Sequence, residues 1–105
     1  MAISEIKEKD FAAEVLDYKG GVVVDFYANW CGPCKALRPI LEELSEEYGG
    51  VKFVSVDVDE AETLAYRYSV SSIPCVVFIR DGVEVSRSIG IRPKDLFIEN
   101  INLIQ

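Results

Sequence analysis

The chain has 105 residues, half of them apolar, with a formal net charge of −7 and no histidine. Its length fits one compact domain, residues 1–105. The acidic balance argues against a nucleic-acid partner, because binding that polyanion requires clustered Lys and Arg to neutralise phosphates. Without histidine, Ser-His-Asp and Cys-His catalysis are excluded. No run approaches the roughly 20 apolar residues of a membrane span, and the start lacks a secretory pattern. We therefore expect a cytoplasmic protein with no membrane partner.

The first half of the chain predicts alternating strands and helices. Residues 3–6 predict a short strand and residues 10–16 a helix. Residues 22–28 are a near-continuous apolar, β-branched run, typical of a strand covered on both faces in the middle of a sheet. Residues 34–48 carry apolar side chains at helical spacing, which predicts a longer helix that contains Pro39.

The second half predicts one more strand, a helix, a hairpin and a final helix. Residues 51–57 predict the strand, and Asp59 with Glu62 three residues later predicts a capping pair that opens the helix after it. An amphipathic pattern beginning near Pro93 predicts the terminal helix, with proline in its first turn.

The hairpin is centred on Asp81-Gly82, a strong two-residue turn signal between residues 75–80 and 83–89. Crossover helices make the first three strands parallel, whereas the hairpin adds antiparallel strands. The sequence therefore predicts an α/β fold: a mixed central sheet of about five strands with four helices on its two faces.

Two thiols, Cys31 and Cys34, lie where the apolar strand passes into the longer helix. Unpaired amides and the positive end of the helix dipole stabilise a thiolate at Cys31, so we expect a depressed pKa and a nucleophile there. Cys34, one turn further in, is expected to be less exposed and to resolve a mixed disulfide formed at Cys31. Gly32 and Pro33 allow and then fix the turn between them.

Other roles for the two thiols have less support. Zinc requires about four ligands, and the only further soft ligand is Cys75. A structural disulfide closing so small a ring would stabilise the fold only modestly. Lys35 and Arg38 follow the cysteines as a basic patch, which either helps to select protein partners or is a solvated helix face.

Asp25 lies inside the apolar strand, so its carboxyl group should be buried with a raised pKa. A raised pKa suits proton transfer near neutrality, and we expect Asp25 to accept the proton of Cys34 during resolution and to return it later. An aspartate on a locally hydrated side of the strand is the alternative interpretation.

The chain resembles the thioredoxin family over essentially its whole length. The residues that carry the resemblance are 24–35, which include Trp30-Cys31-Gly32-Pro33-Cys34, together with Pro39, Ser72-Ile73-Pro74, Asp81-Gly82 and Gly90. The resemblance implies a thioredoxin fold in a single domain and a protein disulfide reductase that binds no cofactor. Its implied partners are disulfide-containing client proteins and a thioredoxin reductase that uses NADPH or ferredoxin; we expect a monomer.

The resemblance also implies a cis peptide bond before Pro74 and a shallow apolar surface that receives the client. The residues expected on that surface are Trp30, Gly32, Pro33, Ile73, Pro74, Gly90 and Ile91. A proline at position 74 removes a competing donor, while the Ile73 backbone stays free to pair with an extended client strand. The Gly-Pro pair between the cysteines favours a reductase over oxidase and isomerase relatives, which commonly carry His there.

Two positions depart from the family pattern. Cys75 stands where Thr is common and adds a third thiol near the site; strand alternation favours a small buried residue over a second redox centre. Ser55 stands where many members carry a charged residue close to the buried aspartate, so the proton chemistry of Asp25 could be tuned differently. Two other functions remain open: a non-catalytic partner-binding module, and a metal or iron-sulfur carrier.

Overall fold

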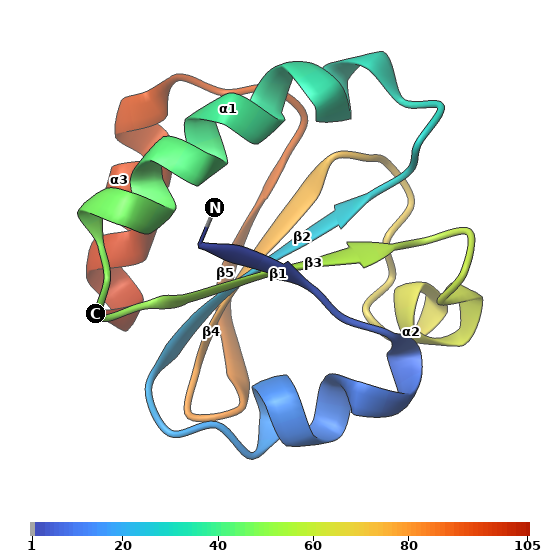
Figure 1. Ribbon diagram of the computed structural model, residues 1–105, viewed down its shortest axis with the longest axis horizontal. Coiled ribbons are helices and arrows are strands. Elements are labelled where there is room, and N and C mark those ends of the chain that lie inside the picture. Colours follow the sequence, from blue (N-terminus) through green and yellow to red (C-terminus); the bar gives the residue numbers. More distant parts are fainter. Residues whose placement is uncertain (1) are drawn as a thin grey trace.

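A five-stranded mixed sheet forms the centre of the computed structural model, which describes residues 2–105 (Figure 1). Its strands are β1 (Ile3–Glu5), β2 (Gly21–Tyr27), β3 (Lys52–Asp57), β4 (Cys75–Arg80) and β5 (Val83–Ile89), in the order β1-β3-β2-β4-β5. β1 and β2 both run parallel to β3, whereas β4 is antiparallel to β2 and to β5. The mixed sheet expected from the sequence is confirmed, with β2 at its centre.

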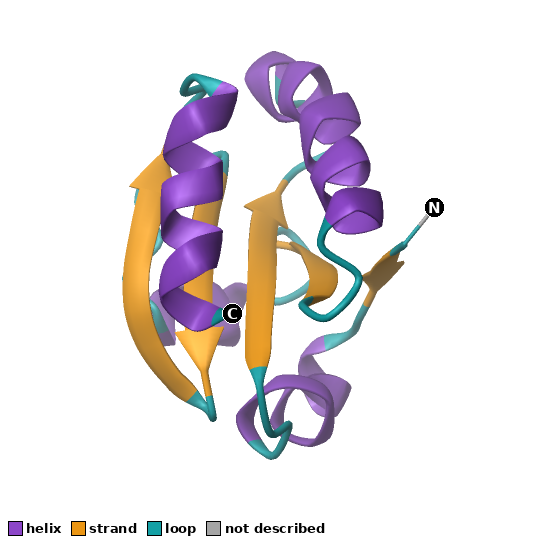
Figure 2. Ribbon diagram, turned by 90° about the vertical axis from the view of Figure 1, so that its left-hand side faces the viewer, coloured by secondary structure: helices purple, strands orange, loops and turns teal. Residues whose placement is uncertain are grey.

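Two apolar layers cover the sheet, one on each face. The α1 (Gly32–Glu47) and α3 (Lys94–Ile104) helices pack on one face, where Leu37, Leu41 and Phe97 are buried. Figure 2 shows these two helices side by side on that face. The opposite face is covered by α2 (Glu62–Arg67) and by a helical segment near the N-terminus. None of the helices in the described chain is long and apolar enough to cross a membrane.

The N-terminal helical segment differs from the α-helix expected over residues 10–16. It consists of a 3₁₀ turn, η1 (Glu8–Asp10), followed by a π-helical turn, η2 (Ala12–Leu16). The wider turn ends where the N–H of Asp17 donates to the carbonyl of Ala12 over 2.9 Å. Apolar spacing in so short a segment indicates which side is buried, but it does not distinguish i+4 from i+5 hydrogen bonding.

The capping pair expected at Asp59 and Glu62 is wrong. The helix α2 begins at Glu62 with Ala61 as its N-cap, and no side chain of its own caps it. Instead, the Leu64 N–H donates to a carboxylate oxygen of Glu8, 3.2 Å away and 56 residues earlier in the chain. The free N–H groups of the first turn thus find a partner brought in by the tertiary fold.

The hairpin turn and the register of β2 both follow the sequence pattern. Asp81 and Gly82 have φ angles of +50° and +82°, as the predicted two-residue turn requires. Successive side chains of β2 point to opposite faces of the sheet, so Asp25 shares the face of Val23, beneath α1. The end of β2 and the start of α1 therefore place a buried carboxyl group close to the two cysteines.

Candidate active site

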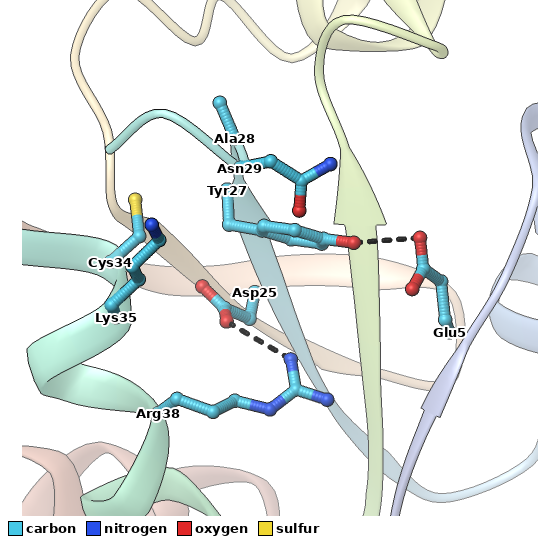
Figure 3. Close-up of a pocket in the computed structure, with 8 residues that line it drawn as sticks. All are labelled: Glu5, Asp25, Tyr27, Ala28, Asn29, Cys34, Lys35 and Arg38. Atoms are coloured by element: carbon cyan, nitrogen blue, oxygen red, sulfur yellow. Dashed lines mark hydrogen bonds and ion pairs between the residues drawn. The ribbon is translucent and has the colours of Figure 1, made fainter. Parts of the chain in front are cut away.

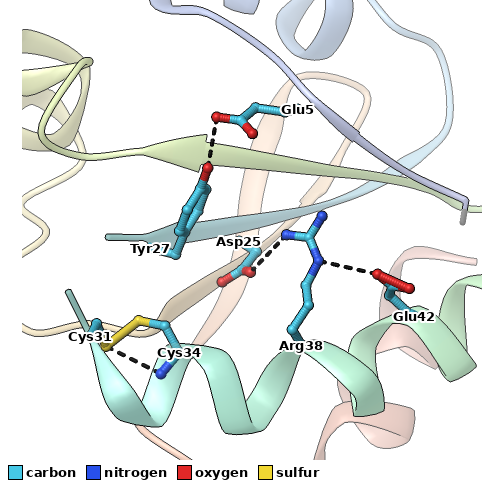
Figure 4. Close-up of polar contacts among 7 residues, drawn as sticks. All are labelled: Glu5, Asp25, Tyr27, Cys31, Cys34, Arg38 and Glu42. Atoms are coloured by element: carbon cyan, nitrogen blue, oxygen red, sulfur yellow. Dashed lines mark hydrogen bonds and ion pairs between the residues drawn. A yellow bond between two sulfur atoms is a disulfide. The ribbon is translucent and has the colours of Figure 1, made fainter. Parts of the chain in front are cut away.

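The two cysteines form a disulfide at the start of α1. Cys31 is the N-cap of the helix, and the Cα atoms of Cys31 and Cys34 are 5.3 Å apart. The backbone N–H of Cys34 donates to the Sγ of Cys31 over 3.2 Å, so the first sulfur receives one of the free N–H groups of the helix terminus (Figure 4). Sulfur at this position is placed to carry negative charge.

The expected difference in exposure between the two cysteines is wrong for the disulfide form. Both Cys31 and Cys34 are 4% exposed. As residues, the two cysteines are therefore equally buried in the disulfide form. Their distinct environments instead come from the backbone: Cys31 precedes the helix in extended conformation, whereas Cys34 lies within its first turn.

Gly32 and Pro33 are exposed between the cysteines and begin α1. Proline is favoured in a first helical turn, where the missing donor would have had no partner. A Cβ added at Gly32 would meet no atom within 4 Å, so the space around this residue does not require glycine.

The cis peptide bond expected between Ile73 and Pro74 is present. Ile73 packs against the cluster formed by Ala28 and the two cysteines, and the N–H of Gly90 donates to the Pro74 carbonyl over 2.8 Å. Within residues 2–105, neither backbone polar group of Ile73 has a recorded hydrogen-bond partner. The loop before β4 therefore offers a donor and an acceptor beside the disulfide.

Two large apolar side chains expected at the client surface are exposed. Trp30 is 71% exposed and Ile91 is 48% exposed. The Trp30 indole N–H donates to the carboxylate of Asp59 over 2.8 Å, which fixes the ring orientation without burying it. Aromatic area that is oriented yet exposed is typical of a contact residue in protein recognition.

Asp25 is buried, as the sequence predicts, and it lies against a cavity of about 240 Å³ that Cys34 also lines (Figure 3). The residue is only 3% exposed, and its Oδ1 atom has no hydrogen-bond partner among the described protein atoms. Burial raises the pKa of the Asp25 carboxyl to about 7, although the positive charge of Arg38 opposes this rise. A group with this pKa can both take and give a proton near neutrality.

Arg38 is the residue whose relation to Asp25 the sequence interpretation missed. Its Nη1 atom lies 4.0 Å from Oδ2 of Asp25, and its Nε donates to Glu42 over 3.4 Å (Figure 4). A sequence signal did exist, because Arg38 follows Cys34 by four residues and therefore lies on the same helix face. The sequence suggests that Arg38 either selects protein partners or lies on a solvated helix face. In the structure its guanidinium instead points toward the buried carboxyl group of Asp25.

Cys75 is 1% exposed and packs with the apolar cluster on the η2 and α2 face of the sheet. Burial raises the pKa of its thiol, while Arg87 opposes that rise. This placement agrees with the small buried residue favoured from strand alternation, on the face of the sheet opposite Asp25.

Within residues 2–105, the side chains that come closest to a metal-binding set are acidic and do not include the two cysteines. Ligand atoms of Glu5, Asp57 and Glu60 are all within 4.8 Å of one another. They already have protein partners: the Tyr27 hydroxyl donates to Glu5 over 2.6 Å, and the Asp59 N–H donates to Asp57 over 2.9 Å. These hydrogen bonds connect the acidic groups to the local fold.

An α/β sheet that holds a disulfide at a helix N-terminus, beside a cis-proline loop and a buried carboxyl group, defines a thiol-disulfide oxidoreductase. The family model described as Thioredoxin matches residues 2–103. The chain is 44% identical to thioredoxin of Bacillus subtilis (strain 168) over 103 residues, which covers 97% of each chain. It is 42% identical to thioredoxin of Chlamydia trachomatis over 100 residues, covering 95% of this chain and 96% of the relative.

A third relative, thioredoxin C-2 of Corynebacterium nephridii, is 47% identical over 88 residues, which covers 83% of this chain and 82% of the relative. The chain belongs to the thioredoxin family. It is a protein disulfide reductase with a redox-active cysteine pair, and its family implies disulfide substrates and renewal by a thioredoxin reductase.

Proposed function

We propose that Cys31 is the attacking thiol, that Cys34 resolves, and that Asp25 handles the Cys34 proton. In the reduced protein, the Cys31 thiolate attacks one sulfur of a client disulfide, whose S–S bond breaks. The departing client sulfur takes a proton, and Cys31 is left in a mixed disulfide with the client. Cys34 then passes its proton to the Asp25 carboxylate and attacks the Cys31 sulfur. The bond between Cys31 and the client sulfur breaks as the Cys31–Cys34 disulfide forms, and the client sulfur leaves as a thiolate that takes a proton from solvent.

The hydrogen bond from the Cys34 N–H to the Cys31 sulfur carries this assignment of roles. A donor aimed at one sulfur stabilises its thiolate, and the helix dipole adds to this effect. Among the described residues, no N–H donates to the Cys34 sulfur, but Cys34 shares a cavity with Asp25. One sulfur is thus placed to hold negative charge and the other to lose a proton.

Client binding is proposed to use the surface made by Trp30, Gly32, Pro33, Ile73, Pro74, Gly90 and Ile91. Exposed Trp30 and Ile91 supply apolar area, and the Ile73 backbone groups can pair with an extended client segment. Such binding needs little side-chain specificity, which suits a reductase that acts on many clients. Cys75 takes no part in this cycle.

The Cys31–Cys34 disulfide must be reduced before the protein can act on another client. Reduction of the Cys31–Cys34 disulfide requires two electrons and two protons, and Asp25 in its protonated form can supply the proton that Cys34 takes. We propose that an NADPH-dependent or ferredoxin-dependent reductase delivers the electrons, and that residues 1–105 act as a single-domain monomer. A reducing compartment, the cytoplasm, suits a protein that works as a dithiol.

Turnover of insulin with dithiothreitol tests the proposed cycle. The unmodified protein should accelerate precipitation of the reduced insulin chains, whereas Cys34→Ser should abolish catalytic turnover because nothing resolves the mixed disulfide. Asp25→Asn should slow resolution at neutral pH and remove its titration near pH 7. Undiminished turnover by Cys34→Ser would contradict the cycle, and an unchanged rate and pH profile in Asp25→Asn would contradict the role of Asp25.

A further inference from the structure

Asp25 lies in a row of side chains that extends across the sheet on the face beneath α1. Its neighbours in register are Ser55 on β3 and Val76 on β4. Neither can carry a charge, and the Ser55 hydroxyl has no hydrogen-bond partner among the described protein atoms. The sheet itself therefore brings no cation to the carboxyl group of Asp25 from either adjacent strand.

A cation reaches Asp25 from the helix above it. Arg38 lies one turn after Cys34 on α1, and its Nη1 atom is 4.0 Å from the nearer carboxyl oxygen. That separation is too long for a hydrogen bond, so the interaction is between charges. Glu42, a further turn along, accepts from the Arg38 Nε and holds the guanidinium over the sheet.

Other ionisable groups also face Asp25 or lie near it. From the packed elements they are Cys34, Lys35, Arg38 and Glu42 on α1, Glu5 on β1, Tyr27 on β2, Asp57 on β3 and Cys75 on β4. Of the two cations, Lys35 is exposed at the cavity rim, whereas Arg38 is about one-third exposed and forms the ion pair. Arg38 is thus the positive charge held closest to the carboxyl group.

We propose that Arg38 is a positioning residue for proton transfer, because its guanidinium stabilises the charged form of Asp25 that receives the Cys34 proton. This inference rests on the role proposed above for Asp25. Burial alone would leave a larger fraction of the carboxyl group protonated at neutral pH, and the protonated form cannot accept the Cys34 proton. The Arg38 charge lowers the pKa of Asp25 toward about 7, where the protonated and ionised forms are both populated.

The test is a titration of the Asp25 carboxyl carbon by NMR in the disulfide form, where no thiol titrates at the site. Arg38→Gln should raise the midpoint by ~0.5–1 unit, as expected for one partly screened charge near 4 Å. Arg38→Lys should recover most of the normal value. Lys19→Gln is the matched control: it removes one exposed cation before the start of β2, away from the cysteine end of that strand, and should leave the midpoint unchanged.

Single-turnover resolution of a mixed disulfide provides the functional readout. If the pKa of Asp25 rises by one unit, the ionised fraction of Asp25 at pH 7 falls. The resolution rate in Arg38→Gln should then fall about fivefold and recover at higher pH.

The inference is overturned if Arg38→Gln leaves the midpoint of the Asp25 titration in place, or if Lys19→Gln moves it equally. It is also overturned if Asp25→Asn slows resolution but Arg38→Gln leaves its pH profile unshifted. If Asp25→Asn has no effect on resolution, the proposed role of Asp25 fails instead, whatever the NMR titration of Arg38→Gln shows.

Discussion

The backbone N–H of Cys34 points at the Sγ atom of Cys31 over 3.2 Å, so the second cysteine of the pair helps to stabilise the first. The contact arises because Cys31 is the N-cap of α1 and Cys34 is the third helical residue, the usual donor to an N-cap side chain. A sulfur thus takes the place of the oxygen that ordinarily caps a helix. The reactivity of Cys31 therefore depends on the backbone geometry at the start of α1.

A histidine placed between the cysteines should make the disulfide more oxidising. Pro33→His would add a partial positive charge beside the Cys31 sulfur and favour the thiolate of the reduced form. We expect the reduction potential to rise by about 30 mV, equivalent to about 1.4 kcal/mol for two electrons. Equilibration with glutathione measures it, and Pro33→Gln is the uncharged control. An equal rise in both variants would show that loss of proline, not charge, is responsible.

Replacing the buried carboxyl group should stabilise the protein in alkaline solution. The folded-state pKa of Asp25, about 7, lies above its ordinary value of 3.8, so the folded state holds this proton through a range where the unfolded chain has lost it. Stability therefore falls as pH rises from about 4 to 7, by about 4 kcal/mol for this group. Asp25→Asn should match the unmodified protein near pH 4 and exceed its free energy of unfolding at pH 8.

Urea unfolding of the disulfide form at several pH values measures this difference. Asp17→Asn is the control, because Asp17 is exposed and its substitution should give a difference that changes little with pH. A gap between Asp25→Asn and the unmodified protein that stays constant from pH 4 to pH 8 would contradict the raised pKa of Asp25.

Two glycines with the same backbone conformation should respond differently to alanine. Gly82 and Gly90 have φ angles of +82° and +84°, so each alanine should cost about 1 kcal/mol in backbone strain. At Gly82 the added Cβ would also lie 2.5 Å from the Leu16 carbonyl oxygen, whereas at Gly90 it would meet nothing within 4 Å. Because such a steric clash costs about 2 kcal/mol more, Gly82→Ala should lose about 3 kcal/mol in all. Equal losses in urea unfolding would show that the contact with Leu16 relaxes freely.

Cys75 should stay unreactive while the protein is folded. Its side chain is buried on the face of the sheet opposite Asp25, and burial raises the pKa of its thiol. In the reduced protein, iodoacetamide should label Cys31 first and reach Cys75 only after denaturation. Peptide mapping at successive times measures the order. Labelling of Cys75 as rapid as that of Cys31 would restore the third thiol as a redox candidate.

Local patterns in the sequence predict most of this fold because each carries its own physical cause. The apolar run of β2 predicts a central strand, and Asp81-Gly82 predicts the hairpin turn. The buried, proton-holding state of Asp25 also follows from its position within that run. For the cis bond at Pro74, the family resemblance and not the local sequence carries the prediction.

The features that sequence analysis missed are contacts between distant segments or choices between similar local geometries. Glu8 caps α2 although it lies 56 residues earlier in the chain, and no local sequence pattern predicts a contact over that separation. The π turn in η2 differs from an α-helix by one step in its hydrogen bonding. Arg38 and Asp25 meet because α1 crosses the sheet above β2, so the helix periodicity predicts the face of Arg38 but not its partner.

The division of labour between the two cysteines is tested most directly by mapping the mixed disulfide that forms with a client. Cys34→Ser, reduced and mixed with a disulfide-containing client, should accumulate a covalent complex through Cys31. Cys31→Ser should trap little, because within residues 2–105 the Cys34 sulfur accepts no N–H like the one that stabilises a thiolate at Cys31. Mass spectrometry of the linked peptides identifies the sulfur. A complex joined mainly through Cys34 in Cys31→Ser, formed as fast as that of Cys34→Ser, would contradict the account.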